Sequence, residues 1–241
     1  MPELPYLGNE LEIFAHAQRW KAYWASEIRR FIHGDVAEVG AGIGAVTQLF
    51  LNESFETWTC FEPDPALLRQ LEAALAASIR SGRVGCVAGT LHDATGDTRF
   101  DTVLYIDVLE HIERDHEELE YAAQRLKAGG TLIVLAPAHD FLYSAFDRAI
   151  GHHRRYDKRS LAAAAPTELS CVSLRYLDSV GMLASLANRL WLKQPNPTHA
   201  QIAFWDHRLV PISRRIDPWL QFRLGKSVLG VWHKDATPRA R

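Results

Sequence analysis

Three glycines stand within five residues in the stretch VAEVGAGIGAVTQLF, at Gly40, Gly42 and Gly44. Glycine lets a backbone turn sharply and approach a ligand closely, because no Cβ is in the way. The residues that follow have helical spacing, and the start of a helix presents unpaired N–H groups and a positive dipole end. The stretch therefore predicts a loop that binds a nucleotide or cofactor at the carboxyl end of a strand. The competing interpretation is a tight turn of any α/β protein.

A second feature supports a cofactor loop. Glu62 ends the next expected strand, 22 residues after Gly40, and a carboxylate at that place accepts hydrogen bonds from ribose hydroxyls. The G-x-G-x-G spacing differs from the G-x-G-x-x-G of dinucleotide enzymes, and no G-K-[ST] motif for a triphosphate accompanies it. The alternative for Glu62 is an ordinary acidic residue at a helix N-terminus.

Strands and helices alternate along the chain that positions these residues. We expect strands at 35–41, 57–63, 82–89, 100–107 and 131–138, with helices between them at 44–52, 64–80 and 114–127. The strands are apolar along their whole length, which is typical of a parallel sheet covered by helices on both faces. Asp64 is the expected N-cap of its helix, with Pro65 at the first position, and Gly129–Gly130 is the expected stop of the last helix.

The second half of the chain has a different pattern. We expect a helical cap at 1–34 and a catalytic domain at 35–241, with a lid or substrate insertion at about 138–160 and a helical lobe at about 179–224. Pro211 and Pro218 are expected to break a helix in that lobe. Two late strands, at 168–178 and 226–234, would form an antiparallel hairpin at the sheet edge.

Composition limits the classes of function. The chain has 241 residues, of which 47% are hydrophobic and 23% charged, as in a globular protein with a sizeable core. A net charge of -2 gives no field that favours nucleic acid or an acidic membrane. The three cysteines are far apart, which predicts small core residues in a reducing compartment. Without a signal peptide or a long apolar run, we expect a cytoplasmic protein.

The segment EVGAGIG resembles motif I, E/D-x-G-x-G-x-G, of the class I methyltransferases that use S-adenosylmethionine. CFEPDPALL is similar to their ribose-binding segment, FDTVLYIDVLEHIERD to their fourth strand and its turn, and LKAGGTLIVLAPA to their fifth strand. Together these segments cover residues 35–138. The resemblance implies a doubly wound, Rossmann-like α/β fold with a seven-stranded sheet of order 3-2-1-4-5-7-6, the last strand antiparallel, and helices on both faces.

The resemblance also implies how S-adenosylmethionine is bound, with S-adenosylhomocysteine as the product. The implied cofactor residues follow the first four strands or cover them: Glu38, Gly40, Ala41, Gly42, Gly44, Glu62, Pro63, Gly89, Thr90, Leu91, Asp107 and Trp20. Glu38 would help to bind the amino group, and Trp20 would lie on a covering helix, although core packing is its alternative. Many family members carry an acid beside adenine, but here Asp93 lies later than expected. Adenine recognition would then rest on backbone amides or on Thr90.

Histidines are the candidates for a catalytic base. Methyl transfer needs alignment, desolvation and, for a hydroxyl or a protonated amine, a base. The candidates are His111 in the LEH turn after strand four, His139 at the end of strand five, and His152. The alternative for His111 is a structural role in ordering its loop.

The segment GHHRRY is dense in donors, and a subset of these enzymes has a similar LYS-x-FD…GH-x-RRY region. Arginine forks match carboxylates and phosphates, so we expect acceptor recognition by Tyr143, His153, Arg154, Arg155 and Tyr156. The alternative is a solvated basic turn that pairs with Asp147 and Asp157. No metal is expected, because the acidic cluster of the magnesium-dependent members is absent; a set of His152, His153 and Asp157 is the alternative.

The predicted function is S-adenosylmethionine-dependent methyl transfer to an O or N nucleophile of a small molecule, either biosynthetic or linked to a sugar or lipid. No nucleic acid is expected as a partner, and membrane contact is expected only for a lipid-linked acceptor. The protein would be a monomer or a homodimer. The alternatives are a non-catalytic cofactor-binding protein of the same fold and a dinucleotide oxidoreductase, which the loop spacing disfavours.

Overall fold

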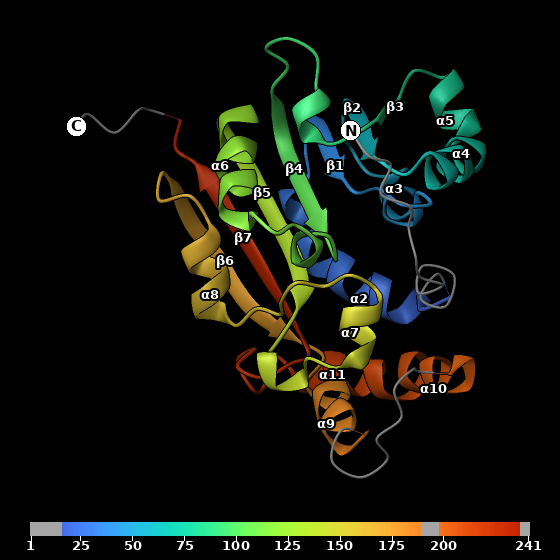
Figure 1. Cartoon of the computed structure of the whole chain (residues 1–241), viewed down its shortest axis with the longest axis vertical. Helices are drawn as coiled ribbons and strands as arrows, with labels where there is room; N and C mark the ends of the chain where they lie inside the picture. The colour runs from blue at the N-terminus through green and yellow to red at the C-terminus, as the bar shows by residue number, and fades with distance from the viewer. Residues whose placement is uncertain (1–15, 189–197, 237–241) are drawn as a thin grey trace.

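The computed structural model describes residues 16–188 and 198–236. Within them, seven strands form one mixed sheet of order β3-β2-β1-β4-β5-β7-β6 (Figure 1), which confirms the predicted topology. The strands are β1 (Asp35–Val39), β2 (Thr57–Glu62), β3 (Val84–Ala88), β4 (Phe100–Ile106), β5 (Leu126–Pro137), β6 (Leu169–Leu177) and β7 (Ser227–Lys234). The helices are α2 (Gln18–Ile28), α3 (Ala45–Phe50), α4 (Pro65–Ala74), α5 (Ala76–Arg80), α6 (Asp115–Arg125), α7 (Ala145–Ala149), α8 (Lys158–Ala164), α9 (Ser179–Ala187), α10 (His199–Phe204) and α11 (Val210–Ile216).

The first five strands are parallel neighbours, and the last strand runs against them. In register, Val36 of β1 lies beside Trp58 of β2 and Thr102 of β4. Strand β7 is antiparallel to both β5 and β6 and lies between them. The predicted late hairpin is therefore confirmed. All parallel strands end at one edge, and the start of β7 lies at that same edge.

Helices cover both faces of the sheet, so the protein has two cores. On one face, α2 and α3 bring large side chains such as Trp24 and Phe50 against Trp58 of β2. On the other, α6 and α8 bring Leu119 and Leu161 against the sheet. Strand residues alternate between the two cores, and both faces are apolar, which accounts for strands that are hydrophobic along their whole length.

Several local predictions need correction, and the first of them concern the helices. The helix expected at 114–127 ends at Arg125, and β5 begins directly at Leu126, with a register shift in its pairing with β4. Gly129, at a φ of 79°, lies inside this irregular stretch of the strand rather than at a helix end. The helix expected at 64–80 is divided into α4 and α5, although Asp64 caps it as predicted, by accepting hydrogen bonds from two backbone amides.

The second correction concerns the helical lobe. Pro211 lies within the first turn of α11 and does not break the helix. A π-helical stretch, Trp205–Leu209, comes directly before it. Its wider turn changes the hydrogen-bond register just where proline lacks a donor. Pro218 does lie beyond the end of α11, as expected.

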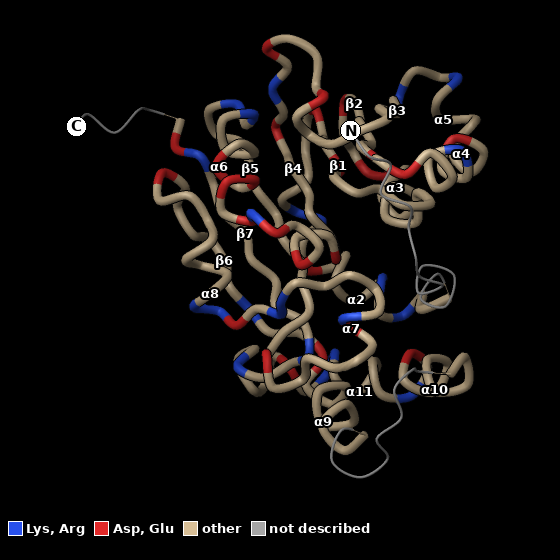
Figure 2. The backbone as a smooth tube through the Cα atoms, viewed as in Figure 1, with Lys and Arg blue, Asp and Glu red and all other residues tan. Residues whose placement is uncertain are grey.

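The third correction concerns the cysteines and the surface. Cys60 is buried, but Cys171 is exposed on the edge strand β6. Lys and Arg are interspersed with Asp and Glu along the chain (Figure 2), in keeping with the small net charge. In the part of the chain that is described, no helix has the length and apolar composition to cross a membrane. The cap predicted at 1–34 is described only from residue 16.

Candidate functional site

The glycine loop lies at the carboxyl end of β1, as the sequence predicts. Gly40, Gly42 and Gly44 all have positive φ, at 67°, 55° and 78°. A Cβ on Gly40 would lie 2.7 Å from Cγ2 of Val108, in the turn after β4. Glycine is therefore required at position 40 both by backbone conformation and by close packing.

Hydrogen bonds fix this loop to the end of β2. The amides of Gly40 and Ala41 donate to the carbonyl oxygen of Phe61, at 2.9 and 3.0 Å. The amide of Gly42 donates to Oε2 of Glu62 at 2.7 Å, and the amide of Asp64 donates to Oε1 at 2.9 Å. Each carboxylate oxygen keeps a second lone pair. Glu62 can therefore hold the loop and still accept hydrogen bonds from a ligand.

Glu38 lies beneath the loop and not on its surface. Its Oε2 accepts hydrogen bonds from the Thr47 hydroxyl at 2.6 Å and from the Trp58 indole at 2.8 Å. Burial raises the pKa of Glu38 to about 7. The structure thus gives Glu38 a role in joining β1 to β2 and α3. The implied contact with the cofactor's amino group stays a prediction.

The segment after β3 contains Asp93, the acid that lies later in the sequence than the family pattern leads us to expect. Oδ2 of Asp93 accepts hydrogen bonds from the amide and the hydroxyl of Thr90, at 2.8 and 3.2 Å. The amide of Gly89 donates to the carbonyl of Glu62, and Leu91 is buried in the core. Asp93 thus turns back beside Thr90, and a contact of either residue with adenine stays a prediction.

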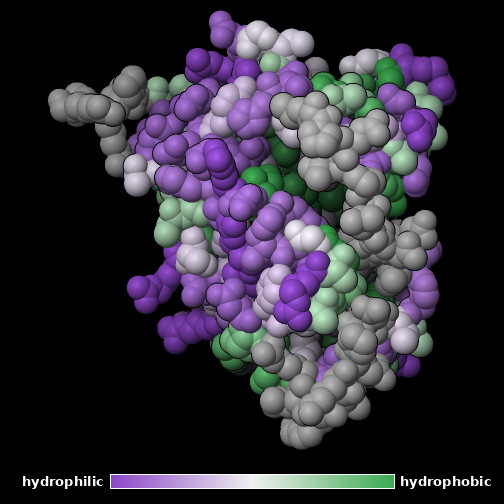
Figure 3. Space-filling model, viewed as in Figure 1, coloured by the Kyte–Doolittle hydropathy of each residue, from purple (hydrophilic) through white to green (hydrophobic). Residues whose placement is uncertain are grey.

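Asp107 ends β4 in a left-handed conformation, with a φ of 54°. Its amide donates to the carbonyl of Leu135 at 2.8 Å. The side chain is accessible to solvent, although protein lies close around the carboxyl group. This surrounding raises the pKa of Asp107 to about 6, against the lowering effect of His152 and Lys226. Near the middle of the face that Figure 3 shows, hydrophobic atoms lie deeper than the hydrophilic atoms around them.

Trp20 is a core residue of α2. Its ring lies against those of Tyr23 and Trp205, with centroids 6.0 and 5.9 Å away. Its amide donates to Oδ1 of Asp206 at 2.8 Å. These contacts correspond to the alternative of core packing, and they attach α2 to the helical lobe.

Two of the three candidate histidines come together. The rings of His111 and His152 are 4.6 Å apart between centroids and nearly perpendicular, at 82°. His152 Nδ1 lies 3.0 Å from Oδ1 of Asp147, and its Nε2 lies 3.8 Å from Oε1 of Glu110. The protein around the ring, together with His152 and His153, lowers the pKa of His111 to about 4 by disfavouring its charged form, although part of the ring is accessible to solvent. Both imidazoles are thus held beside a buried carboxyl at the turn after β4.

His139, the third candidate histidine, does not join the pair of His111 and His152. It has a φ of 67°, and its ring lies against those of Phe141 and Tyr176, with centroids 4.9 and 4.6 Å away. Its Nε2 is buried without a hydrogen-bond partner among the residues that are described. Burial lowers the pKa of His139.

The predicted acceptor residues are engaged within the lid. Asp147 is fully buried and accepts hydrogen bonds from Nε and Nη2 of Arg155, at 2.8 and 3.1 Å. Arg154 pairs with Asp115 at 2.6 Å, and the hydroxyl of Tyr156 donates to the same carboxylate at 2.7 Å.

Two further predicted residues make backbone contacts. The hydroxyl of Tyr143 donates to the carbonyl of His152 at 2.6 Å, and the amide of His153 donates to the carbonyl of Glu110 at 2.8 Å. Tyr156 is 1% exposed. Its side chain is therefore not accessible to an acceptor in this structure. The guanidinium groups of Arg154 and Arg155 form ion pairs with Asp115 and Asp147.

Three residues near this site were not predicted from the sequence. Glu110 stands beside the candidate His111, and Asp147 is expected from the sequence only as a partner of the basic turn. Lys226 directly precedes β7, and its carbonyl accepts a hydrogen bond from the amide of Ala138, just after β5. Burial lowers the pKa of Lys226. The predicted antiparallel last strand places its first residue at the carboxyl edge, which was the signal available for Lys226.

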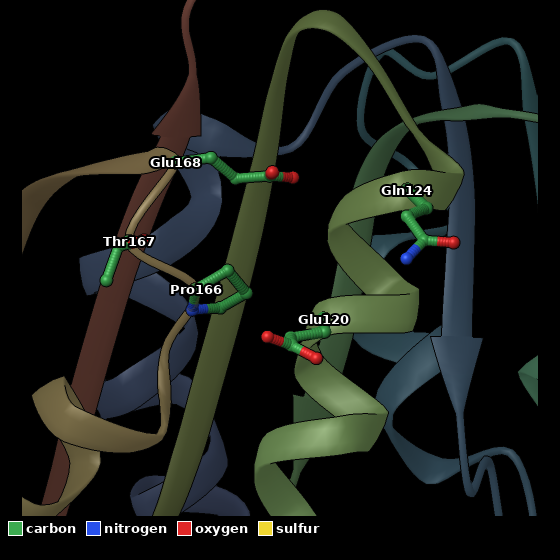
Figure 4. A pocket seen from close by; sticks show the side chains of 5 residues that line it. All are labelled: Glu120, Gln124, Pro166, Thr167 and Glu168. Atoms are coloured by element: carbon green, nitrogen blue, oxygen red, sulfur yellow. The ribbon is translucent and has the colours of Figure 1, made fainter.

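A depression elsewhere on the molecule is not part of this site. It is lined by Glu120, Gln124, Pro166, Thr167 and Glu168, from α6 and the segment before β6 (Figure 4). These residues lie near the amino ends of the strands. The predicted cofactor residues lie at the opposite edge.

Comparison with known proteins supports the predicted class. Residues 37–132 match the family of methyltransferase domains, whereas no curated protein matches the sequence significantly. A chain from the complex between the Haloferax volcanii Trm112 methyltransferase activator and the putative methyltransferase is similar in structure. It has 15% identity and a TM-score of 0.63, over 97% of this chain and 100% of that chain.

Two further solved structures are similar. A putative sarcosine dimethylglycine methyltransferase from Galdieria sulphuraria has 15% identity and a TM-score of 0.60, over 91% of this chain and 86% of that one. Phosphoethanolamine N-methyltransferase 2 from Haemonchus contortus, in complex with S-adenosyl-L-methionine, has 15% identity and a TM-score of 0.63, over 94% of this chain and 57% of that one. At these identities the likeness shows the fold.

Residues 37–132 thus match a family of methyltransferase domains, and the chain has the fold of solved S-adenosylmethionine-dependent methyltransferases. S-adenosylmethionine is the cofactor of that class. The residues present fit it: Gly40, Gly42 and Gly44 turn sharply with positive φ at the carboxyl end of β1, and Glu62 keeps lone pairs for hydroxyl donors.

Proposed function

We propose that this protein transfers a methyl group from S-adenosylmethionine to an O or N nucleophile of a small molecule. The observation that supports this most directly is the Gly40–Gly44 loop, which is held against Glu62 at the carboxyl edge of the sheet. When bound, the cofactor supplies an electrophilic methyl group on a sulfonium, whose sulfur leaves as a neutral thioether when the carbon–sulfur bond breaks.

The chain's own residues would bind the cofactor, orient it toward the acceptor, and exclude water from the site. Glu62 would accept hydrogen bonds from the ribose hydroxyls, and Asp93 beside Thr90 would provide an acceptor near adenine. The glycine loop would face the methionine part. A buried, preorganised site of this kind lowers the barrier mainly by alignment and desolvation.

His152 is the best-oriented candidate for a base. Its Nδ1 is hydrogen-bonded to Asp147, which leaves Nε2 free of that bond and directed toward Glu110. A carboxylate that holds one ring nitrogen fixes the tautomer of the other. The lid at about 138–160, which contains both residues, would enclose the acceptor. His111, beside it, would be neutral at physiological pH because its pKa is lowered.

We infer a small-molecule acceptor and a cytoplasmic location. Cys60 and Cys86 are adjacent across β2 and β3 as free thiols, as a reducing compartment would keep them. Charges of both signs are interspersed over the chain, which supports neither nucleic acid nor an acidic membrane as the partner.

Calorimetric titration with S-adenosylhomocysteine tests the cofactor site. The wild type, Glu62→Ala and Glu72→Ala are compared, because Glu72 is an exposed glutamate on the neighbouring helix α4. We expect micromolar binding by the wild type and by Glu72→Ala, and binding at least about tenfold weaker in Glu62→Ala, the cost of roughly one charge-assisted hydrogen bond. Thermal unfolding of each variant checks that the fold is intact.

Two results of these titrations would contradict the proposal. Wild-type protein that binds NAD but not S-adenosylhomocysteine would contradict the proposed cofactor. Binding of S-adenosylhomocysteine with equal affinity by all three proteins would contradict the role of Glu62. Turnover is then measured as formation of S-adenosylhomocysteine by mass spectrometry, over a panel of hydroxyl and amine acceptors.

A further inference from the structure

We propose that Glu110, His111 and His152 form a binding site for a divalent transition-metal ion at the turn after β4. One ligand atom of each side chain, a carboxylate oxygen or an imidazole nitrogen, lies within 4.8 Å of the other two. Ligands bonded to one such ion at 2.0–2.2 Å lie about 3 to 4 Å from one another. Small side-chain rotations therefore suffice to bring all three atoms onto one ion.

The orientation of His152 favours this site. Its Nδ1 is bonded to Oδ1 of Asp147 at 3.0 Å, and its Nε2 lies 3.8 Å from Oε1 of Glu110. Metal-binding histidines usually make such a bond to a carboxylate through the nitrogen that does not bind the metal. Asp147 is itself held by Arg155 and by the amide and hydroxyl of Ser144, so the imidazole is fixed before any ion arrives.

Glu110 supplies a second, independent observation. Its side chain is 1% exposed, and its Oε2 has no hydrogen-bond partner within residues 16–188 and 198–236. A buried carboxyl without a partner is costly, and native structures rarely keep one without a use. Burial and the nearby Asp107 raise the pKa of Glu110. A cation would supply the missing partner and stabilise the carboxylate.

The ligand types indicate which cations fit. Two imidazoles and one carboxylate are typical ligands of Zn²⁺, Mn²⁺ and Fe²⁺, whereas Mg²⁺ and Ca²⁺ prefer oxygen ligands throughout. Three protein ligands leave at least one coordination position open, as in catalytic sites. His111 is accessible to solvent, which gives the ion a path of entry and places the open side outward.

The position of the proposed metal site beside Asp107 indicates a role for the bound ion in the reaction. Asp107, at the end of β4, is close enough to Glu110 and His152 for their charges to interact. An ion held by these three side chains would bind a hydroxyl of the acceptor at its open coordination position and lower the pKa of that hydroxyl, so that the oxygen becomes a better nucleophile. With the ion bound, Nε2 of His152 is occupied, and the ion takes over the activating role that His152 would have as a base. This role rests on the proposed function and favours a hydroxyl over an amine acceptor. The site itself does not depend on the cofactor.

From the sequence no metal was expected, and the alternative was a different set of residues. Of that set, His153 contacts Glu110 through its backbone amide, and Asp157 caps α8 by accepting from Ser160. The set proposed here joins two segments that are about forty residues apart in the chain. Only the fold brings them together.

Titration of metal-free protein with Co²⁺, followed by its visible absorption, tests the proposal, because coordination by histidine changes both the position and the intensity of these bands. The matched variants are Glu110→Gln, His111→Ala and His152→Ala. His92→Ala is the control, because His92 and Glu118 form another His–Glu pair, 3.0 Å apart, outside the site. Zn²⁺, Mn²⁺ and Mg²⁺ are then added as competitors.

We expect saturable binding by the wild type and by His92→Ala, and at least about tenfold weaker binding by each of the three site variants. Zn²⁺ and Mn²⁺ should displace Co²⁺, and Mg²⁺ should not. Equal affinity in wild type and in the three site variants, or no saturable binding at all, would overturn the proposal. His111→Ala keeps the test sharp if a buried variant fails to fold, since His111 is exposed. The Co²⁺ titration is carried out without S-adenosylmethionine or S-adenosylhomocysteine, so its result is independent of the S-adenosylhomocysteine titration.

Discussion

The indole N–H of Trp58 donates a 2.8 Å hydrogen bond to Oε2 of Glu38, and both side chains are buried beneath the glycine loop. Strand β2 thereby holds the acid of β1 in the apolar core of one sheet face. The hydroxyl of Thr47, from α3, donates to the same oxygen. The position of the loop thus depends on a carboxyl that water does not reach.

This relationship predicts how stability depends on pH. Burial raises the pKa of Glu38 to about 7, from an ordinary value of 4.5. The folded protein therefore binds more protons than the unfolded chain between these values, and the free energy of unfolding falls as pH rises through this window. Glu38→Gln should remove that part of the dependence, at most about 3 kcal/mol. Urea unfolding of both proteins at about pH 5 and about pH 8 measures it. Parallel pH profiles of wild type and variant would contradict the prediction.

A substitution at Gly40 should destabilise the protein through packing as well as backbone strain. Gly40→Ala would place a methyl 2.7 Å from Val108, at a φ of 67°. Gly82→Ala is the matched control, because Gly82 has a φ of 76° and no atom within 4 Å of the added Cβ. Strain alone costs about 1–2 kcal/mol, and overpacking adds roughly 1–3 kcal/mol. Urea unfolding should show a larger loss for Gly40→Ala, and equal losses would refute the packing argument.

The hydroxyl of Tyr23 should contribute strongly to the attachment of α2. It donates a 2.7 Å hydrogen bond to Oδ2 of the buried Asp217, after α11. Tyr23→Phe leaves this carboxylate short of one donor, at a cost of about 1.5–3 kcal/mol. In the control, Tyr121→Phe removes a half-buried hydroxyl that accepts from Arg125, and the cost should be below about 1 kcal/mol. Thermal unfolding compares the two, and a larger loss for Tyr121→Phe would count against this assignment.

Asp147 should hold the lid together. It accepts hydrogen bonds from Ser144, His152 and Arg155 while fully buried. Asp147→Ala should therefore increase amide hydrogen exchange in residues 144–155 by at least about tenfold, while the sheet stays protected. Asp157→Ala, which removes only the N-cap of α8, should leave that segment unchanged. Exchange that rises uniformly over the whole chain in Asp147→Ala would indicate a global role instead.

Much of the fold follows from local patterns. Strands that are apolar throughout predict burial on both faces, and Asp64 followed by proline predicts a helix start. Pro211 shows the limit of such patterns: proline is read as a helix breaker, but the preceding π-helical stretch accommodates it. Whether a proline breaks a helix depends on the conformation of the neighbouring turns, which the helix propensity of proline alone does not predict.

The site was predictable where its residues are contiguous in sequence. The glycine loop and Glu62 lie at the strand ends where spacing places them. Sequence spacing places Asp93 later than the family pattern, and it does not reveal the short helical turn that brings its carboxylate to Thr90. Glu110 and His152 meet only because the lid folds over the turn after β4. Contacts of that kind depend on the path of a loop, which residue types do not determine.

Strand β7 has a consequence for the order in which the protein is made. Synthesis proceeds from the N-terminus, so β5 and β6 leave the ribosome before the strand that joins them. Until β7 arrives, a nascent chain carries an open edge on β5, and β6 has no neighbour at all. Unpaired apolar edges of this kind recruit other chains. Newly made molecules should therefore depend on chaperones for longer than a protein whose last strand lies at the rim of its sheet.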